Sequence, residues 1–286
     1  MKTGLLEILR CPTCSGRYRS ESNRLVCTDC QAEIPLQGGI PLFSDVPPDI
    51  TPSEKRPRGI GMDTTWRSAN TRFLESEVRW IPGNAIVLDV GAGRGDFSGL
   101  FAGQRYLAVE IYPYPEVDIV CDLTKINPFA PASLDVILLM NVLEHLPDAT
   151  ECIRSLSGLL RPGGKILVAV PFLVKIHQSP YDFARYTHYL LQKMGEDAGL
   201  QIERMEGYYD PAFLIRESER YVRFWALSRY PAFRRRMLAV MLAGLRLYHA
   251  LLFRLLGAGY LADVAKENNP APVGYHVIYR KAEQSS

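Results

Sequence analysis

The chain has 286 residues, of which 47% are hydrophobic and 22% are charged, and its formal net charge is +2. This composition excludes a disordered chain, a collagen-like chain and a small disulfide-dense fold, and the charge does not indicate a strongly basic nucleic-acid binder. At about 150 residues per domain, the length fits roughly two domains, or one enlarged domain with an appendage. The first 25 residues hold no unbroken apolar segment, because Glu7 and Arg10 interrupt the only candidate, so we expect a cytoplasmic protein.

Four of the six cysteines form two C-x-x-C pairs separated by twelve residues: Cys11 with Cys14, and Cys27 with Cys30. Two such pairs supply the four thiolates of a tetrahedral zinc site, and a site with four protein ligands is structural. Two disulfides are the competing interpretation, but they require an oxidising compartment. We therefore predict one structural Zn²⁺ ion.

The residues around these cysteines, Leu5 to Pro12 and Gly38 to Phe43, resemble the small zinc-ribbon family that includes the activator subunit of tRNA methyltransferases. The resemblance covers roughly residues 3–45, and it implies a ribbon that stabilises a methyltransferase. We predict a zinc ribbon at 1–45, a proline-rich linker at 46–65 and a catalytic domain at 66–286.

A short apolar strand that ends at Asp89 runs directly into the glycines Gly91, Gly93 and Gly95. Glycine lets a backbone turn sharply and approach a ligand, so this junction is typical of a nucleotide-cofactor site. The dinucleotide pattern G-x-G-x-x-G is not met, because the third glycine comes one residue early, and this disfavours NAD.

The run Val87-Leu-Asp-Val-Gly-Ala-Gly-Arg-Gly95 resembles motif I of the class I S-adenosylmethionine-dependent methyltransferases. Alternating strands and helices independently predict an α/β fold with a doubly wound parallel sheet, and the family implies seven strands in a Rossmann-like arrangement. The resemblance runs from about residue 80 to 210. It implies S-adenosylmethionine as cofactor, with contacts from the loop residues Asp89, Gly91, Ala92, Gly93 and Gly95.

Further expected strands follow in the order of that family. One ends at Glu110, nineteen residues beyond Gly91, where a carboxylate can take both ribose hydroxyls. A third strand leads to Asp122 and Leu123, which in the family lie beside the adenine amine. A fourth, Leu134 to Met140, precedes Asn141, which we also assign to the cofactor.

Methyl transfer needs an in-line nucleophile and, where the acceptor carries a proton, a base. The candidate catalytic residues are His145, after the fourth strand, and the set His177, Tyr181, Asp182 and Arg185, after the fifth strand. For both histidines a purely structural role stays open.

Some quinone-type O-methyltransferases bind magnesium through a glutamate-rich version of the Glu144-His145 loop. Asn141 stands where their first glutamate would be, which argues against a catalytic metal here.

The family's sheet ends in a hairpin, and the segments 201–207 and 274–280 resemble its two strands. The predicted insertion between them (211–268) is basic: residues 211–260 contain nine arginines and two glutamates, a charge of +7. No uncharged run within 237–262 exceeds nine residues, too few for a membrane span. Helical periodicity predicts an amphipathic basic helix. Three roles stay open for it: binding to an anionic membrane surface, packing as a lid or dimer helix, and binding to RNA phosphates.

These features predict a methyltransferase with a small-molecule, glycan or lipid-linked acceptor. RNA methylation is an alternative suggested by the ribbon's relatives, although the chain lacks an Asn-Pro-Pro-Tyr motif. A second alternative is a non-catalytic scaffold or regulatory partner.

Overall fold

The computed structural model describes residues 2, 4–45, 65–208, 215, 218–219, 221–222, 229–256 and 272–283. The predicted linker lies almost wholly outside these residues, as do parts of the predicted insertion. Packing divides the chain into two compact units. The first comprises residues 1–171, 176–206 and 276–286, and the second comprises 172–175 and 207–275.

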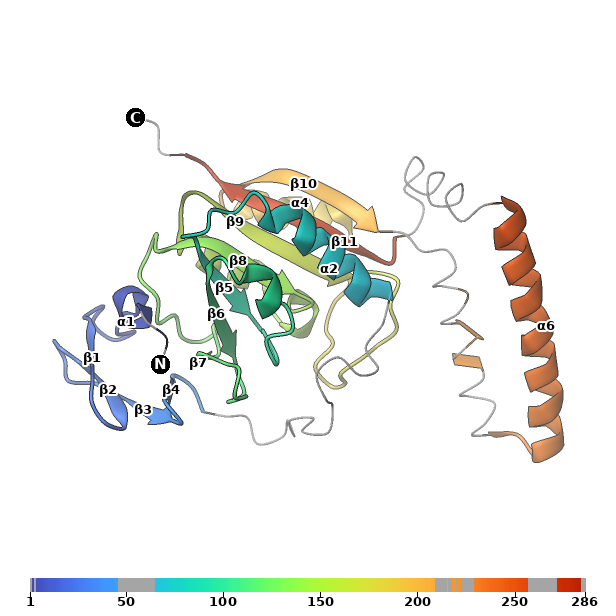
Figure 1. The fold of residues 1–286 in the computed structure, drawn as a ribbon, viewed down its shortest axis with the longest axis horizontal. Helices are drawn as coiled ribbons and strands as arrows, with labels where there is room; N and C mark the ends of the chain where they lie inside the picture. The colour runs from blue at the N-terminus through green and yellow to red at the C-terminus, as the bar shows by residue number, and fades with distance from the viewer. Residues whose placement is uncertain are drawn as a thin grey trace. The chain divides into compact units, whose positions relative to one another are not determined.

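The N-terminal segment, residues 4–45, contains a short helix and a small antiparallel sheet (Figure 1). Its elements are α1 (Leu5–Ile8), β1 (Tyr18–Ser20), β2 (Arg24–Cys27), β3 (Glu33–Gln37) and β4 (Ile40–Pro41), and the strand order is β1-β2-β3-β4.

A seven-stranded sheet forms the centre of the first unit. Its strands are β5 (Ile86–Val90), β6 (Arg105–Glu110), β7 (Ile119–Val120), β8 (Leu134–Met140), β9 (Leu160–Pro171), β10 (Leu200–Tyr208) and β11 (Gly274–Lys281). Their order is β10-β11-β9-β8-β5-β6-β7, and β7, β6, β5, β8 and β9 pair in parallel. The strands β6 and β7 follow β5 on one side of it, whereas β8 and β9 lie on its other side. Ligands of open α/β sheets bind at such a switch point, at the carboxyl ends of the strands.

Besides α1, the described residues form the helices α2 (Thr65–Val78), α3 (Ala149–Ser157), α4 (His188–Asp197) and α6 (Ala232–Leu256), and the 3₁₀ turns η1 (Ser98–Phe101) and η2 (Leu143–His145). Phe73 and Leu74 of α2 pack in one apolar cluster with alternate residues of the sheet, including Ile278 of β11. The next residue, Tyr279, points to the other face, where its hydroxyl donates to the carbonyl of Leu191 in α4. Helices therefore cover both faces of the sheet, and the predicted doubly wound α/β fold is confirmed.

The N-terminal segment packs on the β7 edge of the large sheet. The backbone N–H of Phe43 donates to the carbonyl of Val120 at 2.8 Å, and Leu42 forms a parallel bridge with Val120. After α1 in the same segment, the N–H of Arg10 donates to the carbonyl of Pro128 at 2.8 Å. The small sheet thus occupies an edge that would otherwise expose unpaired backbone groups.

Among the described residues, no helix combines the length and the hydropathy that a membrane span requires.

Candidate functional site

The glycine loop after β5 is shaped by three left-handed residues: Gly91, Gly93 and Gly95 have φ of +69°, +55° and +67°. Residues that carry a side chain rarely adopt this backbone conformation, which explains why glycine stands at these three positions. A Cβ on Gly91 would lie 2.7 Å from Cγ2 of Val142, whereas a Cβ on Gly93 would meet no heavy atom within 4 Å. The space beside Gly93 is therefore open, and the loop after β8 lies directly against Gly91.

Glu110, at the end of β6, lies beside that open space. Its carboxylate accepts hydrogen bonds from the N–H of Gly93 at 2.9 Å and of Ile111 at 2.7 Å. Burial raises the pKa of Glu110, and these two backbone donors oppose the rise. The arrangement fixes an acidic side chain at the carboxyl end of the strand, where hydroxyl groups of a ligand would find acceptors.

Asp122 and Leu123 follow β7. Burial alone would raise the pKa of Asp122, but hydrogen bonds from Lys125 and Thr124 lower it, so the group is a carboxylate at neutral pH. The N–H of Asp122 donates to the hydroxyl of Ser44 at 3.1 Å, which ties this loop to the N-terminal segment. Sequence reasoning missed Ser44, since no local pattern marks it.

Asp89 lies beneath the glycine loop rather than at its surface. The side chain is buried, and the hydroxyl of Tyr106 donates to its carboxyl group. Burial raises the pKa of Asp89 to about 7, against the lowering effect of the Tyr106 hydrogen bond. Asp89 is therefore placed to stabilise the glycine loop from within the protein.

This raised pKa predicts a pH-dependent stability. The native state keeps the proton of Asp89 up to about pH 7, whereas the unfolded chain releases it near pH 4, so the free energy of unfolding falls between these values. Asp89→Asn removes this loss, and we expect it to exceed wild type by up to about 4 kcal/mol above pH 7 and by little near pH 4. Denaturant unfolding across this range measures the difference, with Asp197→Asn as a control; parallel wild-type and Asp89→Asn profiles would contradict the prediction.

Asn141, directly after β8, has φ of +59° and is held by a buried network. Asn70 of α2 donates from Nδ2 to Oδ1 of Asn141 at 2.6 Å, and Nε2 of His276 lies 2.9 Å from Oδ1 of Asn70. Burial lowers the pKa of His276 to about 3, so this imidazole is neutral. Within the described residues, Nδ2 of Asn141 is buried and makes no hydrogen bond, which leaves its N–H groups for a ligand.

Three titratable side chains converge beyond Asn141. Glu144 is fully buried, and its two carboxylate oxygens have no hydrogen-bond partner among the described residues. Oε1 of Glu144 lies 3.8 Å from Nε2 of His145 and 3.7 Å from Nε2 of His177. The side chains meet although 32 residues separate the two histidines, and Glu144 was absent from the predicted catalytic set.

The segment 177–187 is fixed by an ion pair. Arg185 donates to both carboxylate oxygens of Asp182, at 2.5 and 2.8 Å, and the N–H of His177 donates to the same carboxylate at 2.7 Å. The hydrogen bonds of Arg185 hold the pKa of Asp182 far below its usual range. Nδ1 of His145 lies 2.5 Å from the backbone carbonyl of Tyr181, while the Tyr181 side chain is exposed. All five predicted catalytic residues thus lie in one neighbourhood.

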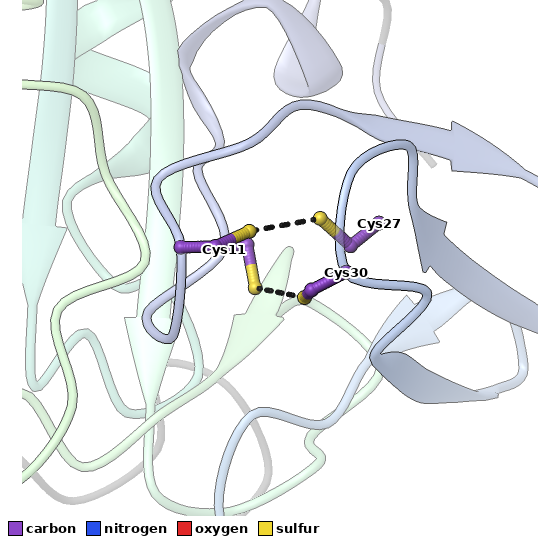
Figure 2. Close-up of side chains that lie close together, drawn as sticks. Cys11, Cys27 and Cys30 are labelled. Carbon is purple, nitrogen blue, oxygen red and sulfur yellow. Dashed lines mark hydrogen bonds between the residues drawn. The ribbon is translucent and has the colours of Figure 1, made fainter.

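The four paired cysteines also converge, from the segment between α1 and β1 on one side and from β2 and the turn after it on the other. Figure 2 shows Cys11 facing Cys27 and Cys30. Their sulfur atoms lie within 4.8 Å of one another, with 3.6 Å between Cys11 and Cys30 and 3.4 Å between Cys14 and Cys27. A tetrahedron with Zn–S bonds of about 2.3 Å has sulfur–sulfur edges of roughly 3.8 Å. All four are free thiols, so the residues fit a Cys₄ metal site.

Comparison with known proteins concerns the part of the chain that carries the glycine loop. A family model described as a methyltransferase domain matches residues 61–213, just over half of the chain. A ubiquinone biosynthesis O-methyltransferase from Xanthomonas euvesicatoria pv. vesicatoria (strain 85-10) is 34% identical over 116 residues, which cover 35% of this chain and 46% of that protein. The enzyme of the same name from Pseudomonas paraeruginosa (strain DSM 24068 / PA7) is 30% identical over 163 residues, 50% of this chain and 65% of the relative.

The chain thus spans about half the length of the curated relatives it matches. One similar solved structure is the Burkholderia thailandensis 1,6-didemethyltoxoflavin-N1-methyltransferase with bound 1,6-didemethyltoxoflavin and S-adenosylhomocysteine. Its TM-score is 0.49 and its sequence identity is 17%. The match covers 79% of this chain and 82% of that one. The family match identifies the chain as a member of the methyltransferase domain family, and the glycine loop and the acids that follow it lie within the matched residues.

Proposed function

We propose that this methyltransferase acts on a small-molecule, glycan or lipid-linked acceptor in the cytoplasm, in part at the periphery of a membrane. The observation that carries the proposal is the group formed by Glu144 and His145, after β8, with His177, after β9. The loop after β8 also lies against the glycine loop, through Val142. Such a group suits an acceptor that must lose a proton as it is methylated.

In this proposal the cofactor is held by residues at the carboxyl ends of β5, β6, β7 and β8. The backbone of Ala92 and Gly93 would lie against it, Glu110 would accept from its ribose hydroxyls, and Asp122 with Leu123 would adjoin its adenine. The open space at Gly93 and the unused donor of Asn141 both fit a bound ligand. S-adenosylmethionine supplies a methyl group activated by a sulfonium.

We assign the role of general base to His145. If Nδ1 donates to the Tyr181 carbonyl, the tautomer is fixed and Nε2 keeps its lone pair. A proton accepted at Nε2 would face the buried carboxylate of Glu144, whose negative charge stabilises a cationic imidazole. His177, Asp182 and Arg185 then act as positioning residues that hold the 177–187 segment over this base.

His145→Asn tests this assignment, because asparagine can still donate to the Tyr181 carbonyl but is not a base. We expect kcat to fall by about 100-fold or more at pH 7, and the Kd of S-adenosylmethionine to stay within about twofold. His188→Asn, in α4, is the matched control and should keep wild-type kcat. An unchanged kcat in His145→Asn would remove His145 from catalysis.

The acceptor class is tested by incubating the purified protein with methyl-tritiated S-adenosylmethionine and an extract of its native cell. The products are separated into organic, glycan, RNA, protein and small-polar fractions. Label in the organic, glycan or small-polar fraction supports the proposal, and that fraction then serves as substrate for the His145 variant. Label in RNA would favour the RNA alternative, and no label despite cofactor binding would favour a scaffold.

We further propose that residues 1–45 form a structural zinc ribbon in front of the catalytic domain, with Cys11, Cys14, Cys27 and Cys30 as ligands. The distances between their sulfur atoms support this proposal. The resemblance of this ribbon to an activator of tRNA methyltransferases bears only on the alternative in which the enzyme methylates RNA.

A further inference from the structure

Helix α6 in the second unit carries two chemically different faces. At about 100° per residue, Leu242, Arg246 and His249 fall on one side of the helix. Glu219 meets this side: Nε of Arg246 donates to its Oε2 at 2.6 Å, and Nδ1 of His249 lies 3.4 Å from its Oε1. Leu242 is buried, and so is Glu219. This side is therefore the one that packs within the unit.

The other side of α6 is apolar and exposed. Its large side chains fall within an arc of about 120°, centred away from Leu242. They are between 52% and 84% exposed: Phe233, Met237, Val240, Met241, Leu247, Tyr248, Leu251 and Leu255. So many exposed apolar groups on one continuous face mark a surface that contacts something apolar.

Arginines border this apolar face on both sides. Arg236 and Arg254 fall about 20° beyond one edge of the arc, and Arg234 falls about 20° beyond the other. All three side chains are exposed. The 25 residues of α6 include no aspartate and no glutamate, so the helix itself offers no counter-charge to these guanidinium groups. A partner that covers this face would therefore meet positive charge at both edges of an apolar centre.

We propose that the apolar face of α6 docks onto an anionic lipid bilayer and lies in the plane of its interface. The large apolar side chains enter the boundary between headgroups and acyl chains, while the bordering arginines contact lipid phosphates. Guanidinium groups suit this task because they bind phosphate with two parallel hydrogen bonds. This inference deepens the proposed membrane contact and does not depend on the identity of the methyl acceptor.

Two other occupants fit the face less well. A second copy of the chain would cover the apolar centre but place arginines against arginines, since the helix has no acid to pair with them across a two-fold axis. RNA would match the arginines, but phosphate binding gives no use for a broad exposed stripe of Leu, Val, Met and Phe. Of these three occupants, the lipid surface is the one that uses both the apolar centre and the charged borders.

The test is co-flotation of the full-length protein with vesicles of phosphatidylcholine alone, or with about one third phosphatidylglycerol added. We expect binding to the anionic vesicles, at least about tenfold weaker binding to phosphatidylcholine, and weakening as NaCl rises from about 0.05 M to about 0.5 M. Val240→Asp with Leu251→Asp should abolish flotation, and Arg236→Gln with Arg254→Gln should reduce it about tenfold and flatten its salt dependence.

Tyr189→Asp is the matched control, because Tyr189 in α4 is as exposed as Val240, at 73%, but lies in the first unit. It should float like wild type. Binding of S-adenosylmethionine, measured on every variant, verifies the fold and reports on the methyltransferase proposal separately. The inference is overturned if wild type ignores anionic vesicles at low salt, or if the aspartate pair floats normally. It is equally overturned if light scattering finds, without flotation, a dimer that the aspartate pair dissociates.

Discussion

Replacing Gly93 with leucine is expected to weaken the binding of S-adenosylmethionine by about 100-fold or more, equivalent to about 2.7 kcal/mol. The missing Cβ of Gly93 faces space that no protein atom occupies within 4 Å, and the N–H of the same residue holds the carboxylate of Glu110. A leucine side chain would fill the space proposed for the cofactor. Isothermal titration of the purified variant measures the loss directly.

A matched control separates this effect from backbone strain. Gly38, in the turn between β3 and β4, has φ of +58° against +55° for Gly93, and a Cβ there would also meet nothing within 4 Å. A left-handed backbone costs a residue with a side chain about 1–2 kcal/mol, so Gly38→Leu and Gly93→Leu should lower stability alike. Only Gly93→Leu should lose the cofactor. Equal affinity in both variants would show that the open space at Gly93 is not the binding site.

Much of the fold could be predicted because its signals are local. The predicted fourth strand, Leu134 to Met140, coincides with β8, and the glycine loop lies where the run from Val87 to Gly95 placed it. The alternation of strands and helices predicts a helix between the glycine loop and the next strand, but the structure has only a single 3₁₀ turn there, Ser98–Phe101, in a stretch that contains Gly99 and Gly103. Each glycine disfavours a helix by about 1 kcal/mol, so a longer helix is unfavourable in this stretch.

The start of β9 differs from the prediction because the strand pairs with β8 on both sides of an irregularity. The sequence predicts a turn at 161–165 followed by a strand, whereas β9 already begins at Leu160. Leu134 pairs with Leu160 and Val136 with Lys165, so the Arg-Pro-Gly-Gly residues form an irregularity inside a continuous strand. A proline and two glycines signal a break in regular pairing, but they do not reveal whether the strand resumes on the same partner.

The candidate site was predictable only where the chain itself brings residues together. Asn70 and His276, which fix the amide of Asn141, lie 71 and 135 residues from it along the chain. Neither residue stands in a motif, and a polar residue on a helix or strand is ordinarily taken as surface. Glu144 was visible in the sequence, but its burial without hydrogen bonds is a property of the folded packing alone.

Replacing Cys11 and Cys14 with serine is expected to lower the zinc content from about one ion per chain to none and to unfold residues 4–45. Structural zinc contributes on the order of 10 kcal/mol to zinc-finger peptides, comparable with the total stability of a domain. A segment this short buries little apolar surface by itself. Cys152→Ala, at a buried thiol of α3, is the control: it should cost packing energy but leave the zinc in place.

The consequences should reach the large sheet, because the N-terminal segment pairs with its β7 edge. Loss of zinc would release the hydrogen bond from Phe43 to the Val120 carbonyl and the one from Asp122 to Ser44, which supports the proposed adenine contact. Hydrogen exchange should therefore accelerate at the amides of Phe43 and Asp122 in the serine variant, while the amides of β8, at the centre of the sheet, stay protected. Metal analysis and exchange together decide the matter: a wild-type protein that contains no zinc but protects Phe43 would show that the cysteines fold this segment without a metal.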